Sequence, residues 1–119
     1  MTLSIEQIAT AISRHSFEDA YPYLLDDVRW RLVDGEDLEG KAAVVATCET
    51  SARYLSGVMT RFDKFVVRAM DNCVVIESVA TYSEPGGDTS VVASCDIYDF
   101  TSGKLSTIAS YNIELEGNS

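Results

Sequence analysis

The chain has 119 residues, 46% of them hydrophobic and 24% charged, and its 19 acidic and 9 basic residues give a net charge of −10. This length and composition predict one folded domain over residues 1–119 and exclude an intrinsically disordered chain. The acidic excess argues against nucleic acids and anionic membranes as partners, because both are bound mainly through Lys and Arg.

The N-terminus, the length of the apolar runs and the cysteines favour a protein of the cytoplasm. The N-terminus lacks the basic and apolar segments of a secretory signal, and no apolar run approaches the ~20 residues that span a bilayer. Cys48, Cys73 and Cys95 form no CxxC pair and no metal-ligand spacing. We therefore expect three buried thiols in a reducing compartment, with no metal and no cofactor.

Two helices are expected first. The first is amphipathic, with Ser4 and Gln7 as a capping box, and its apolar face carries Ile5, Ile8, Ala9 and Ile12. A second, short helix is expected over residues 17–25. Because Pro22 is unfavourable inside a helix, this segment either begins at Phe17 or begins late, with Asp19 as its cap.

The middle of the chain alternates strand, loop and helix. Val28 to Val33 has the period-two pattern of a strand, and Asp34 to Gly40 is expected to be an acidic loop without the spacing of a calcium-binding EF-hand. A long helix is predicted from Lys41 to Ser56, ended by Gly57.

Four long strands joined by hairpin turns are predicted for the rest of the chain. Asp71-Asn72, Glu84 to Asp88 and Thr101 to Gly103 supply the turns, and the tail after Leu115 is expected to fray. The strands are Thr60–Met70, Cys73–Ser83, Thr89–Phe100 and Lys104–Leu115. Strands of this length twist, so we expect an α+β domain whose curved, mostly antiparallel sheet closes over helices and leaves a pocket between the layers.

Three stretches along the chain resemble the nuclear transport factor 2-like superfamily, which includes ketosteroid isomerases and SnoaL-like polyketide cyclases. They are Phe17-Glu-Asp-Ala with the following Leu-Leu-Asp-Asp-Val-Arg-Trp, Leu38-Glu-Gly-Lys-Ala-Ala-Val, and Cys95-Asp-Ile-Tyr-Asp-Phe-Thr-Ser-Gly-Lys-Leu. The resemblance implies a cone-shaped α+β barrel with three helices in the concavity of the sheet.

The resemblance also implies particular site positions. Asp96 matches the late-strand aspartate that donates to the developing oxyanion in the isomerases. The isomerase base falls at Leu32 and the oxyanion tyrosine falls near Ile8, and neither residue can perform that role. Steroid isomerase chemistry is therefore not expected.

Strand alternation places Asp96 on one face with Val92, Ser94, Tyr98 and Phe100. On a concave apolar face its carboxyl group would be desolvated and suited to proton transfer, whereas at a rim it would only be solvated.

Four aromatic residues are candidate ligand contacts. Tyr98 and Tyr111 are expected to project into the same cavity, Trp30 to form a wall, and Tyr54 to lie at the mouth. His15 is the one histidine of the sequence, and we expect it to be exposed at a helix end.

Two functions remain open. One is a pocket protein for a small apolar or carbonyl-containing molecule, acting as a cofactor-independent lyase, isomerase, cyclase or hydrolase with Asp96 as catalytic residue. The other is a non-catalytic dimerisation or ligand-binding module of the same fold. Both imply a homodimer through the outer sheet face, where Val91, Ala93, Cys95 and Ile97 form an apolar stripe.

Overall fold

The computed structural model describes residues 2–33 and 35–115. The elements follow in chain order as helix α1 (Ile5–Ser13), 3₁₀ helix η1 (Phe17–Tyr23), strands β1 (Leu24–Leu32) and β2 (Asp37–Glu39), helix α2 (Lys41–Leu55), and strands β3 (Met59–Met70), β4 (Cys73–Ser83), β5 (Thr89–Thr101) and β6 (Lys104–Leu115).

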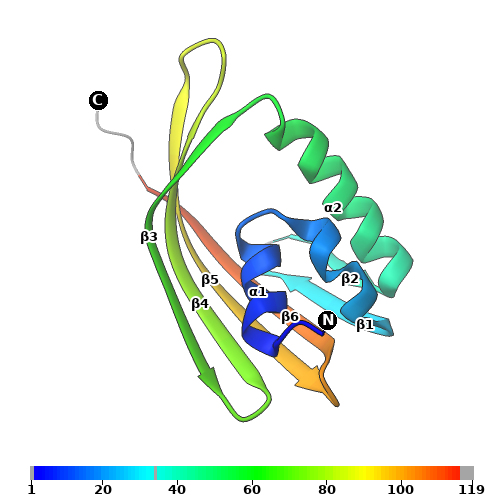
Figure 1. Cartoon of the computed structure of the whole chain (residues 1–119). Coiled ribbons are helices and arrows are strands. Elements are labelled where there is room, and N and C mark those ends of the chain that lie inside the picture. The colour runs from blue at the N-terminus through cyan, green and yellow to red at the C-terminus, as the bar shows by residue number, and fades with distance from the viewer. Residues whose placement is uncertain (1, 34, 116–119) are drawn as a thin grey trace.

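Within the described residues, the strands form one six-stranded sheet in the order β2-β1-β6-β5-β4-β3. The β1–β6 pair is parallel and the other pairs are antiparallel. The long strands bend together, so that the sheet curves around α1 and η1 while α2 crosses near β1 and β2 (Figure 1). This is the expected cone-shaped α+β fold, with helices in the concavity of a curved, mostly antiparallel sheet.

Helix α1 forms as its sequence predicts. Ser4 Oγ accepts from the backbone N–H of Gln7, and the Gln7 side chain accepts from the N–H of Ser4, which completes the capping box. Its apolar stripe, including Ile8 and Ile12, is buried against the sheet.

The next segment differs from its prediction. It is a 3₁₀ helix that begins at Phe17 and contains Pro22, and it ends at Tyr23. Pro22 would interrupt an α-helix in this short segment, which instead adopts the tighter 3₁₀ form. Leu24 consequently belongs to β1, which starts four residues before the predicted Val28.

The predicted acidic loop contains a short strand. Asp37 to Glu39 pair with β1 as β2, through Leu38 opposite Trp30 and Arg29 opposite Glu39. A three-residue edge strand has too little periodicity to be recognised from sequence. Asp34 in this loop, and the predicted frayed tail at residues 116–119, lie outside the described residues.

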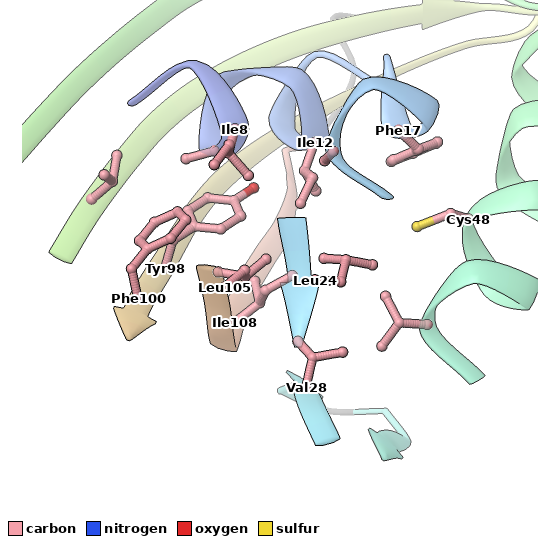
Figure 2. Packing of buried hydrophobic residues seen from close by; sticks show 14 of the residues in the cluster. Ile8, Ile12, Phe17, Leu24, Val28, Cys48, Tyr98, Phe100, Leu105 and Ile108 are labelled. Carbon is pink, nitrogen blue, oxygen red and sulfur yellow. The ribbon is translucent and has the colours of Figure 1, made fainter. Parts of the chain in front are cut away.

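The core joins the helices to the concave face of the sheet. Figure 2 shows Ile8, Ile12 and Phe17 packed over Leu24, Tyr98 and Leu105, with Cys48 entering from α2. Of the three cysteines, only Cys48 is buried as predicted. Cys73 and Cys95 are half-buried, because they lie on the outer face of β4 and β5.

The hairpin turns lie where predicted. Asp71 and Ser102 have positive φ angles of 53° and 51°, and Gly103 follows Ser102 with φ 80°. These are the left-handed conformations that tight hairpins require. No helix among the described residues is long and apolar enough to cross a membrane.

Candidate functional site

A cavity of about 580 Å³ lies between the concave face of the sheet and the C-terminal ends of α1 and α2. Its lining combines apolar side chains such as Leu55 and Val92 with hydroxyl groups and one carboxyl group, that of Asp96. A wider, more open groove runs along the outside of α1 and η1. That groove carries exposed charges, whereas the inner cavity is lined by a desolvated carboxyl group together with apolar and hydroxyl side chains, so the inner cavity is the better candidate site.

Asp96 lies on the inner face of β5, opposite Ile76 of β4 and Ser110 of β6. Strand alternation predicts which residues share its face, and the structure turns that face inward, which is the concave one of the two alternatives. Ser13, in the last turn of α1, donates a hydrogen bond of 2.9 Å from its Oγ to Asp96 Oδ2. The carboxyl group therefore joins the helix layer to the sheet at the edge of the cavity.

Two hydrogen-bond chains end at this carboxyl group. Because Ser13 gives its single proton to Asp96, it accepts from the hydroxyl of Tyr98, 2.6 Å away. On the other side Trp30 Nε1 donates to Ser110 Oγ over 2.9 Å, which leaves the Ser110 proton for Asp96. Both chains direct their donors at Asp96, so they support its ionised form.

Burial opposes these donors and has the larger effect. Loss of solvent around Asp96 raises the pKa of its carboxyl group, and the hydrogen bonds from Ser110 and Ser13 only partly lower it. The net direction is upward from the usual 3.8. This carboxyl group therefore takes up a proton at a higher pH than an exposed aspartate does.

Three of the four predicted aromatic residues line the cavity. Trp30 forms part of its wall. Tyr98 is completely buried at its base, with the hydroxyl group bonded to Ser13. Tyr54 is 58% exposed and donates to Glu84 Oε1 over 2.8 Å, which joins the end of α2 to the turn between β4 and β5.

The predicted position of Tyr111 was wrong. It pairs with Cys95 on the outer face of the sheet, is exposed, and accepts a hydrogen bond from Arg31. The cavity is instead lined by its neighbours in β6, Ser110 and Asn112.

The expectation that His15 is exposed was also wrong. Its ring is half-buried, lines the cavity, and lies with Nε2 3.1 Å from the hydroxyl oxygen of Tyr82. Sequence reasoning missed Ser13, Tyr82 and Ser110 as site residues. No local motif marks Ser13 or Tyr82, and the period of β6 does not indicate Ser110, because a register shift near the last hairpin turn determines which face it lies on.

The positions that the resemblance assigns to the isomerase base and the oxyanion tyrosine, Leu32 and Ile8, carry no functional group. Leu32 lines the cavity, so the site of the isomerase base faces inward but carries no acid. Ile8 is fully buried in the core, and the residue of α1 that reaches Asp96 is Ser13. Among the described residues, no group of three His, Cys, Asp or Glu side chains is arranged to hold a metal ion.

Comparison with known proteins matches the SnoaL-like domain family to residues 5–108. A nuclear transport factor 2-like protein of unknown function from Cytophaga hutchinsonii is 30% identical, with a TM-score of 0.78 over 89% of this chain and 93% of that one. A proposed polyketide cyclase from Pseudomonas putida is 18% identical, with a TM-score of 0.72 over 92% and 91%. A second one, from Xanthomonas campestris, is 23% identical, with a TM-score of 0.68 over 91% and 92%. No curated protein matches the chain.

Replacement of Asp96 by Asn should change how stability depends on pH. Because burial raises the pKa of Asp96, the folded state binds this proton more tightly than the unfolded chain does. The stabilisation from the bound proton is complete below the unfolded pKa and is lost as the pH rises through the folded pKa. Asp96→Asn, neutral throughout, should therefore be at least as stable as the parent at pH 7 and lose this advantage as the pH falls towards ~3.9.

Denaturant unfolding of both proteins between pH 7 and pH 4 measures this difference. Asp88→Asn, in the exposed turn before β5, is the matched control and should show no such trend. The interpretation fails if Asp96→Asn is less stable at pH 7 by about 1 kcal/mol, the value of a lost hydrogen bond, and stays so at pH 4.

Proposed function

Because the chain belongs to the SnoaL-like domain family of the nuclear transport factor 2-like superfamily, we propose that its cavity binds a small, mostly apolar molecule bearing a carbonyl group, beside which Asp96 moves a proton. The observation that carries this proposal is the desolvated Asp96 carboxyl group at the cavity wall, held by hydroxyl groups from α1 and β6. The cavity volume of about 580 Å³ is in the usual range for small-molecule sites.

The chemistry follows from the two forms of the carboxyl group. As a carboxylate, Asp96 can accept a proton from the carbon next to a carbonyl group. As a neutral acid, it can return that proton to another atom of the same molecule or donate a hydrogen bond to an enolate oxygen. A raised pKa brings the two forms closer in energy, which suits a lyase, isomerase, cyclase or hydrolase that uses no cofactor.

The alternative is a ligand-binding module without catalysis. It is favoured by Leu32, which lines the cavity where the resemblance places the isomerase base and which cannot carry a proton. Both functions use the same cavity, so binding alone does not separate them.

The two functions are separated by pairing a binding probe with a reaction probe. Binding of 2-naphthol should quench the fluorescence of Trp30, the single tryptophan of the chain, because this residue lines the cavity. In D₂O the protein should also accelerate deuterium exchange at the carbons next to the carbonyl of 2-tetralone, by on the order of a hundredfold over buffer, as general acid–base catalysis does.

Asp96→Asn should retain naphthol binding and lose the exchange, whereas Asp88→Asn should retain both. Ser94→Leu, which places a larger side chain in the cavity wall, should weaken binding. Binding without exchange in the parent protein would support the non-catalytic module, and absence of binding would contradict both functions.

We also propose a homodimer formed through the outer sheet face. The apolar stripe predicted on β5 continues on its β6 partners, among which Ile113, opposite Ala93, is 66% exposed. Exposed apolar area of this kind is stabilised when a second copy covers it. The free thiols of the three cysteines support placing this dimer in the reducing cytoplasm.

Light scattering at micromolar concentration should show a dimer, and Ile113→Glu should convert it to a monomer because a carboxylate would be buried at the interface. Met59→Glu, at the exposed start of the edge strand β3, is the control and should leave the dimer intact. A parent protein that is monomeric under these conditions would exclude the proposed interface.

A further inference from the structure

His15 has a backbone conformation that favours glycine. Its φ is 69°, its N–H donates to the carbonyl of Ile12, and the N–H of Ser16 donates to that of Ala11. This pair of hydrogen bonds ends many helices, usually with glycine at the left-handed position because a Cβ atom is strained there. Strain retained by a residue with a large side chain is often associated with a functional position. In this structure the left-handed conformation of His15 places an imidazole in the cavity wall.

The imidazole is held in a defined place. Its Nε2 lies 3.1 Å from the hydroxyl oxygen of Tyr82. Its ring centroid lies 5.6 Å from that of Phe17 and 5.7 Å from that of Phe62. Burial lowers the pKa of His15, while burial and the charge of Asp96 raise the pKa of Tyr82. The pair is therefore uncharged at neutral pH.

This pair lies at a different part of the cavity from Asp96. On β4, Ile76 is opposite Asp96, and Tyr82 follows six residues later, close to the turn into β5. Between them β4 turns Ser78 and Ala80 inward, and Val92 lies opposite Ala80 on β5. The charge of Asp96 nevertheless acts on Tyr82. Asp96 and the His15–Tyr82 pair are therefore two separate polar groups of one cavity, with Ser78, Ala80, Val92 and Ser94 on the strands between them.

We propose that His15 and Tyr82 form a second ligand subsite, which binds an uncharged oxygen atom, a hydroxyl or a carbonyl, at the end of the ligand remote from Asp96. The ligand class is then an apolar body with an oxygen atom at each end. A neutral imidazole–phenol pair contains both a donor and an acceptor, so it suits a hydroxyl or carbonyl group better than a carboxylate or phosphate. The net charge of −10 also disfavours anionic ligands.

This inference rests on the proposed function, because it requires the cavity to bind a small molecule, and its test uses the same family of probes. Affinities are measured through Trp30 fluorescence for naphthalene, 2-naphthol, and 2,6- and 2,7-dihydroxynaphthalene. At least one diol should bind about three- to tenfold more tightly than 2-naphthol, the gain expected from one additional hydrogen bond.

Two variants test whether His15 and Tyr82 provide the additional affinity for the diol. Tyr82→Phe removes one hydroxyl group, and His15→Asn removes the imidazole while keeping a residue type that tolerates the left-handed conformation. Each should lower the ratio of diol affinity to 2-naphthol affinity, measured on the same variant, to about one. Tyr21→Phe, which loses a phenol hydroxyl bonded to Glu49 outside the cavity, is the matched control and should retain the gain.

The outcomes separate the two proposals. If 2-naphthol does not bind, the proposed function fails and the subsite fails with it. If 2-naphthol binds but neither diol binds more tightly, or if the gain persists in both Tyr82→Phe and His15→Asn, only the second subsite is overturned. The NMR signal of His15, the single histidine, should shift on addition of the diol and not of naphthalene, and equal shifts for the two would also count against it.

Discussion

The hydrogen bond from Ser13 to Asp96 joins the helix layer to the sheet at the position where the core ends and the cavity begins. On the core side, Ile8 and Ile12 of α1 pack against Tyr98 and its neighbours, as Figure 2 shows. On the cavity side, α1 ends at Ser13 itself, and the C-terminal end of α2 contributes to the wall of the cavity. The same short contact therefore fixes the depth of α1 in the concavity and holds a carboxyl group at the edge of an apolar space.

Much of this arrangement could be predicted from local sequence. The capping box at Ser4 and Gln7 and the turns at Asp71 and Gly103 are short-range patterns with direct physical causes. The period of a long strand predicts which residues share a face with Asp96, but not that this face is the concave one. What could not be predicted depends on contacts between distant segments, such as the edge pairing that makes β2 a strand and the burial of His15.

The error at Tyr111 has a specific cause in the last hairpin. Near the turn, Thr101 pairs with Lys104 and Phe100 with Leu105, and continuing this register would place Tyr111 opposite the inward-facing Ser94. The register shifts by one residue between Asp99 and Phe100, so Tyr111 instead pairs with Cys95 on the outer face. A one-residue shift moves every later side chain of the strand to the opposite face, and nothing in the local sequence marks this bulge.

The cavity also contains two features that destabilise the fold. A desolvated carboxyl group and a histidine in the left-handed conformation both oppose folding, and both point into the same space. Aspartate and histidine destabilise a fold less at exposed surface positions than they do here. Their presence together in one cavity is the pattern expected where stability is given up for binding or proton transfer.

Burial in the cavity shifts the protonation of Asp96. Titration of its side-chain carboxyl by carbon-13 NMR tests this directly, with the signal identified by its absence in Asp96→Asn. We predict a pKa above the usual 3.8, because burial outweighs the hydroxyl donors. A pKa at or below this value would show that the donors dominate, that the carboxyl group is an ordinary structural carboxylate, and that the site is not adapted to proton transfer.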